Sequence, residues 1–330
     1  MQIYRHLDAC PVPLSPSVAT IGNFDGVHRG HRTVIGNVLE RARARGLRSM
    51  VITFDPHPSR AIRPEASPRL ITPLAQKLDL LRSTGVDDVV VLPFTSELSR
   101  MSARQFVHDV LCGKLNIAEL HEGENFRFGY KAEADIHALK TLAAERGFTV
   151  RSYTPQIFRG DAVSSSRIRG LIADGEVSRA RALLGKPFSI RSTPAAGRGY
   201  GTRYAVPTIN LAPYAELLPG NGVYITQMRI GADALAETFD AVTNVGNRPT
   251  FGADSFTVES HLLDFHPITL TEQMPLELCF FARLRNERRF ASPEELREQI
   301  MRDVATAKRY FALLHRVEAG QDAEVSPQLG

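Results

Sequence analysis

The chain reads ATIGNFDGVHRGH over residues 19–31, and this stretch decides the fold of the N-terminal half. A short apolar run leads into a turn with Gly22 and Gly26, and a helix is predicted to begin beside His28. A strand that turns sharply into a helix is typical of nucleotide-binding α/β domains, because the free N–H groups at a helix start attract phosphate. His28 and His31 are three residues apart, so both imidazoles are expected on one face of that helix. The stretch therefore predicts a site for a nucleoside triphosphate.

Strand and helix patterns alternate through the rest of the first half. Apolar strand-like runs lie at residues 18–21, 49–54, 88–92 and 148–153, and amphipathic stripes with helical spacing lie between them. Alternating β and α elements predict a doubly wound, Rossmann-like α/β domain with a parallel sheet. We place this domain at residues 1–185.

The pattern changes after residue 187. Short strand-like runs follow one another at residues 188–191, 223–228, 239–244, 257–263 and 276–284, and Gly, Pro and Asn separate them. This spacing predicts a small antiparallel β-barrel within residues 186–330. A last helix is expected to start at a capping box of Ser292 and Glu295, with its apolar stripe on Leu296, Ile300, Val304, Ala307 and Phe311.

Composition narrows the class of protein. The 330 residues include 43% hydrophobic residues and carry a net charge of +4, which fits a globular protein with anionic small substrates and does not favour nucleic acid. No apolar run is long enough for a membrane span, and the first residues lack the layout of a signal peptide. The three cysteines are far apart in the sequence and suit a reducing cytoplasm. The sequence gives no indication of an oligomer.

A second phosphate-binding candidate is the run VSSSRIR at residues 163–169. The hydroxyls of Ser164 and Ser165 and the guanidinium groups of Arg167 and Arg169 suit phosphate oxygens. Taken alone, the run fits an ordinary helix cap followed by surface arginines equally well. Its pairing with the histidine stretch favours phosphate binding.

Five separated motifs carry a resemblance to a known family. Residues 22–31 and 164–169 resemble the nucleotidyltransferase superfamily of His-x-Gly-His enzymes, and TFDPHP at 53–58 and GENFRFG at 123–129 narrow the resemblance. They are similar to the FAD synthetase module of the prokaryotic bifunctional riboflavin kinase/FAD synthetases. The second half resembles the riboflavin kinase module of the same family through PTIN at 207–210, NVGNRPTF at 244–251 and VESHLLDF at 258–265.

For the first module the resemblance implies adenylyl transfer from ATP to FMN, which yields FAD and pyrophosphate. His28 and His31 would contact the ATP phosphates, Asn125 would orient the substrates, and the side chains of the 164–169 run would hold the pyrophosphate. The turn that binds the nucleotide would be built from Gly22, Asn23, Phe24, Asp25 and Gly30. Phe54 and Phe128 could stack on the flavin, although core packing is an equally good reading of both.

For the second module the resemblance implies phosphorylation of riboflavin to FMN by ATP. Glu259 is the candidate base, although strand alternation alone makes an outward-facing glutamate equally plausible. Thr208 and Asn210 would bind Mg²⁺ together with the nucleotide, and Arg248 would contact phosphate. Riboflavin, FMN, ATP and Mg²⁺ are thus the expected ligands of the chain.

One departure from the family pattern leaves alternatives open. The family usually has a Gly-Arg-x-Leu-Gly run before Pro-Thr-x-Asn, whereas this chain has Thr202 at the arginine position and Ala205 at the second glycine position. An FAD synthetase with a weakened kinase and a non-catalytic flavin-binding protein therefore remain as alternatives. Analysis of the flavin products formed from riboflavin and Mg-ATP distinguishes the three.

Overall fold

The structure is a computed structural model, and it describes residues 1–11, 14–195, 208–232, 235–247, 256–266, 268 and 270–324. The chain forms two compact units. The first unit comprises Met1–Ile168 with Leu183–Gly185, and the second comprises Arg169–Ala182 with Lys186–Gly330. The division between the units therefore does not follow one point in the sequence.

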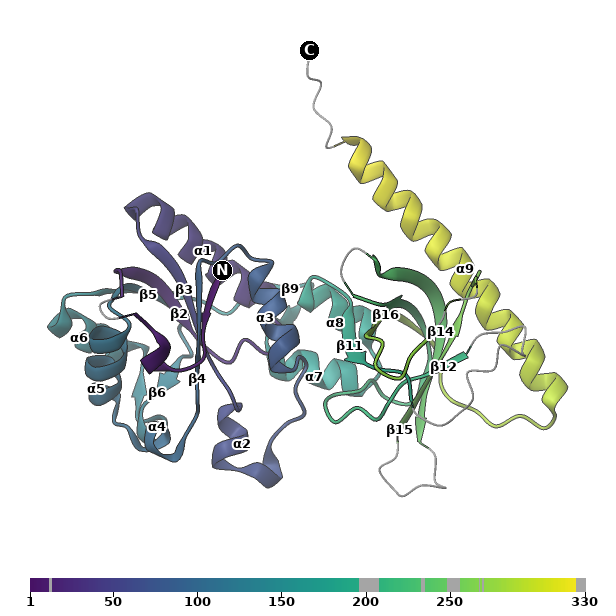
Figure 1. The fold of residues 1–330 in the computed structure, drawn as a ribbon, viewed down its shortest axis with the longest axis horizontal. Helices are drawn as coiled ribbons and strands as arrows, with labels where there is room; N and C mark the ends of the chain where they lie inside the picture. Colours follow the sequence, from purple (N-terminus) through teal and green to yellow (C-terminus); the bar gives the residue numbers. More distant parts are fainter. Residues whose placement is uncertain are drawn as a thin grey trace, which may run out of the picture. The chain divides into compact units, whose positions relative to one another are not determined.

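The first unit is built on a six-stranded parallel sheet with the strand order β1-β4-β3-β2-β5-β8 (Figure 1). The strands are β1 (Gln2–Tyr4), β2 (Ser17–Ile21), β3 (Arg48–Phe54), β4 (Asp88–Leu92), β5 (Ile117–Gly123) and β8 (Thr149–Tyr153). The predicted parallel α/β domain is confirmed. The sequence patterns did not predict the edge strand β1 or the inner strand β5.

Helices cover this sheet through two separate cores. Helices α1 (Arg29–Arg45) and α3 (Leu74–Arg82) contribute to one core with β3 and β4, through residues such as Ile35, Leu78 and Val51. Helix α6 (Ile136–Arg146) and the stretch Ala103–Lys114 contribute to another. In that stretch, the short α5 (Ala103–Gln105) is followed by a π-helix over Phe106–Lys114.

Smaller elements complete this part of the chain. They are α2 (Pro58–Ile62), α4 (Ser96–Arg100), the pair β6 (Arg127–Phe128) and β7 (Ala134–Asp135), the pair β9 (Ile157–Phe158) and β10 (Asp161–Ala162), and the 3₁₀ turns at Leu7–Ala9, Pro64–Ala66 and Tyr130–Ala132. Helices α7 (Ser165–Ala173) and α8 (Val177–Leu184) follow.

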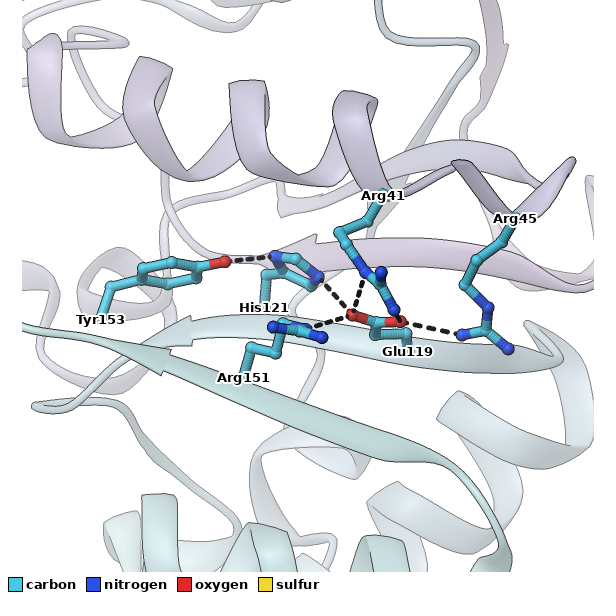
Figure 2. Close-up of polar contacts among 6 residues, drawn as sticks. All are labelled: Arg41, Arg45, Glu119, His121, Arg151 and Tyr153. Atoms are coloured by element: carbon cyan, nitrogen blue, oxygen red, sulfur yellow. Dashed lines mark hydrogen bonds and ion pairs between the residues drawn. The ribbon is translucent and has the colours of Figure 1, made fainter. Parts of the chain in front are cut away.

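A buried carboxylate fastens α1, the helix that starts at the histidines, to the sheet (Figure 2). Glu119 on β5 is 1% exposed and accepts hydrogen bonds from Arg41 at 3.0 Å and Arg45 at 2.9 Å, both on α1. Arg151 on β8 donates to the same carboxylate at 2.7 Å, and His121 lies 3.1 Å from it. Burial opposes ionisation, but the hydrogen bonds from the three guanidinium groups and His121 dominate and lower the pKa of Glu119 to about 2.

The second unit is a six-stranded antiparallel sheet with the order β11-β16-β13-β14-β15-β12. The strands are β11 (Phe188–Ser192), β12 (Thr208–Asn210), β13 (Gly222–Ile230), β14 (Glu237–Asn247), β15 (Phe256–Leu262) and β16 (Leu276–Arg285). Pro194 forms a bridge with Leu211, and Ala195 N–H donates to the carbonyl of Asn210 at 2.8 Å. These bonds link the chain just beyond the two outer strands, and the sheet forms a half-barrel where a small antiparallel barrel was predicted.

The C-terminal helix α9 (Pro293–Glu324) starts at Ser292, whose hydroxyl accepts the Glu295 N–H at 3.2 Å. Ala307 and Phe311 are buried in a core with β13, β14 and β16. Leu296 and Ile300 are each 41% exposed, so the predicted apolar stripe packs fully only in its later part.

Candidate active sites

The turn between β2 and α1 is held in place by the carboxylate of Asp25, which is 3% exposed. It accepts the backbone N–H groups of Ile71 at 3.1 Å and Thr72 at 2.9 Å. The carbonyl of Asp25 accepts the hydroxyl of Ser165 at 2.9 Å. Two candidate segments that are 140 residues apart thus meet at this turn, and Asp25 shapes the turn with its side chain.

The two candidate histidines stack on each other at the start of α1. Their ring centroids are 3.5 Å apart with an interplanar angle of 15°, and Nδ1 of His28 accepts the backbone N–H of His31 at 3.3 Å. A Cβ atom at position 30 would lie 3.4 Å from the His28 ring, which is an ordinary van der Waals contact. The ring of Phe24, buried in the core, packs edge-on against His31 at 5.0 Å. The cap hydrogen bond between His28 and His31 and the ring contact with Phe24 therefore hold the pair in place.

Both imidazoles are neutral at physiological pH. Burial lowers the pKa of His28 to about 4, although the charge of Asp25 opposes the shift. Burial, followed by the nearby His28 and Lys77, lowers the pKa of His31 well below its ordinary value. Within the described part of the chain, no group hydrogen-bonds the buried Nδ1 of His31. A buried ring nitrogen without a protein partner is suited to a ligand.

Lys77 on α3 is a buried cation of this site that the sequence patterns did not reveal. Its side chain is 7% exposed, and its ammonium donates to the Asn23 carbonyl at 3.1 Å, the Thr53 hydroxyl at 3.0 Å and the Phe54 carbonyl at 3.3 Å. Burial lowers the pKa of Lys77 to about 8, against the opposing charges of Asp25 and Asp55. The sequence did indicate that this lysine could be buried, because Lys77 lies three residues after Leu74 on the apolar face of its helix.

The other residues predicted to contact phosphate, in the 164–169 run, have different partners in the structure. Ser164 caps the start of α7 by accepting the Arg167 N–H at 3.2 Å, and the Arg167 guanidinium pairs with Asp161 at 2.8 Å. Arg169 follows on α7, is half-buried and is counted with the second unit. The structure thus brings Ser165 to the histidine turn and engages Arg167 in an ion pair.

The two phenylalanines predicted to stack on the flavin, Phe54 and Phe128, differ in exposure. Phe54 ends β3, is half-buried and packs edge-on against the half-buried Phe94 at 5.5 Å. Phe128 is 8% exposed and lies in the core between Phe106 and Phe126. Phe54 and Phe94 are thus half-buried near the carboxyl ends of neighbouring parallel strands, and Phe128 belongs to the core against which Phe54 packs.

Asn125 lies in the exposed turn after β5, which puts it at the same edge of the sheet as Gly22 and Asn23. Its Oδ1 would lie 2.8 Å from a Cβ atom at position 123. Gly123 therefore leaves room for the Asn125 side chain to fold back over the strand end.

Two of the candidate kinase residues, Asn210 and Glu259, form a row with Asn244 across three strands of the second unit. Asn210 on β12 is in register with Glu259 on β15, and Glu259 is in register with Asn244 on β14. Directly opposed residues of antiparallel strands share a face, so these three half-buried side chains lie together. Thr208, two residues from Asn210, is on the same face opposite His261. Arg248, Thr202 and Ala205 lie outside the described residues.

The described residues also bear on metal binding and on membrane spans. Among them, no group of three or more His, Cys, Asp and Glu side chains could hold a metal ion. In the same part of the chain, no helix has both the length and the apolar character needed to cross a membrane.

Comparison with known proteins gives the family. The family described as FAD synthetase matches residues 11–167, and the family described as riboflavin kinase matches residues 184–311. The bifunctional riboflavin kinase/FMN adenylyltransferase of Escherichia coli strain K12 is 35% identical over 302 residues, which cover 91% of this chain and 95% of that protein. The protein of the same description from Pseudomonas fluorescens is 35% identical over 94% of this chain and 98% of its own length.

A solved structure agrees in fold. A Streptococcus pneumoniae protein described as a macrolide-efflux protein has a TM-score of 0.81 and 25% sequence identity, covering 93% of this chain and 98% of that one. The two family matches cover the positions of the histidine turn and of the Glu259 row. The chain belongs to the bifunctional riboflavin kinase/FMN adenylyltransferase family.

Proposed function

We propose that the two activities of the family, phosphorylation of riboflavin to FMN and adenylylation of FMN to FAD, are performed at two separate sites in this chain. The adenylyltransferase site is the turn with His28 and His31, and the kinase site is the row of Asn210, Glu259 and Asn244. The observation that carries the first assignment is the stacked, neutral imidazole pair at a helix start, with one buried ring nitrogen that lacks a partner among the described residues.

In the first site, an oxygen of the FMN phosphate attacks the α-phosphorus of ATP. The bond from that phosphorus to the bridging oxygen breaks, and pyrophosphate leaves with the electron pair. No proton has to be moved, so the residues contribute by positioning and by hydrogen bonds to the phosphate oxygens. Neutral imidazoles and the first N–H groups of α1 are suited to this task, because they donate hydrogen bonds without needing a counter-charge.

We place the flavin ring at the half-buried Phe54, with Phe94 packed edge-on against it. Flat stacking on such a ring suits the apolar isoalloxazine. Phe128 then contributes through the core that supports this surface, and Asn125 supplies a polar group at the next strand end.

In the second site, the terminal ribityl hydroxyl of riboflavin attacks the γ-phosphorus of ATP, and ADP leaves. The Glu259 carboxylate accepts the hydroxyl proton as the new bond forms. Asn244 and Asn210 flank this carboxylate in register and would orient it and the incoming hydroxyl.

The donor set of the kinase row fits Mg²⁺. The hydroxyl of Thr208 and the amide oxygen of Asn210 are hard oxygen ligands on one face, and magnesium usually keeps several waters and substrate phosphate oxygens besides one or two protein ligands. When bound, Mg²⁺ would neutralise phosphate charge in the transferring group. In the first site, the same ion would be held chiefly by the nucleotide.

Product analysis tests the proposal. The purified chain is incubated with riboflavin and Mg-ATP, or with FMN and Mg-ATP, and the flavins are separated by chromatography. Riboflavin should become FMN and then FAD, and each activity should depend on Mg²⁺. Conversion of FMN to FAD with riboflavin left unchanged would instead support a weakened kinase. Flavin binding without consumption of ATP would overturn the proposal.

A further inference from the structure

Lys77 ties together two loops that meet at the histidine site. Its three hydrogen bonds end on Asn23, in the turn after β2, and on Thr53 and Phe54, at the end of β3. An ammonium has three donors, so these contacts use its full capacity. The Thr53 hydroxyl also donates to the Asn23 carbonyl at 3.3 Å, which makes one connected cluster of the two loops.

Each loop that Lys77 holds carries a part of the proposed site. The turn after β2 leads to His28 within five residues, and Phe54 is the proposed flavin surface. A shift of either loop would change the distance between the phosphate-binding imidazoles and the flavin. Misplacement of reacting groups by about 1 Å can lower a rate about 100-fold.

The charge of Lys77 also acts on the imidazole pair. The titratable groups that face its ammonium are Asp25 on the turn after β2, Asp55 after β3, and His31 on α1. The positive charge is one of the causes that keep His31 neutral. A structural lysine would need only its hydrogen bonds, whereas this one adds a buried charge beside the rings that contact phosphate.

We propose that Lys77 is a positioning residue of FMN adenylylation, which holds the histidine turn against the proposed flavin-binding end of β3. The inference rests on the proposed function of this site. It assigns Lys77 no direct contact with the reacting atoms.

The experiment compares Lys77→Met, Lys77→Arg and the matched control Lys140→Met with the wild-type chain. Lys140 donates one exposed hydrogen bond to Ser152 and lies outside both proposed sites. FMN adenylylation and riboflavin phosphorylation are measured separately between about pH 6 and 10. Lys77→Met should lower kcat/KM for FMN adenylylation at least about tenfold and leave riboflavin phosphorylation within about twofold of wild type.

The pH profile separates positioning by a charged group from simple packing. Wild-type kcat/KM for adenylylation should fall above about pH 8, because this parameter reports the free enzyme and the ammonium loses its proton there. Lys77→Arg stays charged, so it should lack this alkaline fall and keep more activity than Lys77→Met. Lys140→Met should match wild type in both activities and in profile.

Two results would overturn the inference. They are adenylylation by Lys77→Met within about twofold of wild type, and a wild-type profile without an alkaline fall near pH 8. The second result decides the matter even if Lys77→Met does not fold. A wild-type chain that makes FMN but no FAD at any pH would instead refute the proposed adenylyltransferase function.

Discussion

Glu119→Gln is the substitution that tests most directly how α1 is fixed to the sheet. Glutamine keeps the size and one acceptor oxygen of the side chain but removes the negative charge, which leaves the guanidinium groups of Arg41, Arg45 and Arg151 without their common partner. Because α1 begins at the histidine pair, loosening of this helix should also disturb the adenylyltransferase site.

The size of the effect follows from the pKa of Glu119. A fall from the ordinary pKa of 4.5 to about 2 corresponds to roughly 3 kcal/mol, since one pKa unit is about 1.4 kcal/mol. The guanidinium side chains are 38%, 36% and 52% exposed, so solvent screens part of this interaction. We therefore expect a loss of about 2 kcal/mol in the free energy of unfolding at pH 7. For a unit of this size that lowers Tm by about 4–8 °C.

The lowered pKa of Glu119 determines how its contribution to stability changes with pH. A carboxyl whose pKa is lowered by folding stabilises the native state fully above about pH 4.5, and this stabilisation disappears as the pH falls towards about 2. The difference in Tm between wild type and Glu119→Gln should therefore be constant from about pH 5 to 7 and shrink steadily at lower pH.

Calorimetry at several pH values measures this difference. The transition of the first unit is identified as the one after which FAD formation is lost. Glu145→Gln is the matched control, because Glu145 pairs with Arg104 in an exposed ion pair, and its Tm should stay at the wild-type value. An unchanged Tm of Glu119→Gln at pH 7, or a difference that is the same at pH 7 and pH 2, would show that the charge of Glu119 does not fix α1 to the sheet.

Three further predictions concern the sites. His28→Ala should lower FAD formation at least about 100-fold with FMN formation unchanged, and Glu259→Ala should do the reverse; equal damage to both activities in a folded chain would contradict two separate sites. FAD formation should show no inflection near pH 6.5, because the pKa of His28 is about 4. Thermal stability should fall as the pH drops below about 6.5, because the imidazole takes up a proton in the unfolded chain before it does so in the folded chain. Asp25→Ala should cost about 2–3 kcal/mol in chemical denaturation, because two buried N–H groups lose a charged acceptor; a loss below about 0.5 kcal/mol would show that the turn does not depend on this carboxylate.

The positions of most strands could be predicted because apolar periodicity is a local property. The run at 88–92 and the alternating runs of the second half appear in the structure as β4 and as the long barrel strands. The edge strand β1 was missed because its three residues are too few to show a period. Ala307 and Phe311 of α9 are buried, whereas Leu296 near the start of the same helix is exposed. This difference depends on which part of the helix packs on the sheet, and therefore on the tertiary fold.

Some residues of the candidate sites could likewise be found from the sequence, and others only from the structure. The predicted closeness of His28 and His31 is confirmed, although His28 is the N-cap residue of α1 and meets His31 through the cap hydrogen bond. Lys77 escaped detection because the oxygens that it binds lie 23, 24 and 54 residues away in the sequence. The unequal exposure of Phe54 and Phe128 likewise depends on neighbours from other elements.

Local patterns in the sequence were enough to predict the two fold classes and the closeness of the two histidines, because each of these follows from contacts between residues close in the chain. The tertiary structure alone decided which distant groups meet. It placed Asn210, Glu259 and Asn244 in one row, gathered three arginines on Glu119, and packed residues 169–182 with the second unit. Strand register and the burial of charge are set by the whole packed chain, so no local pattern encodes them.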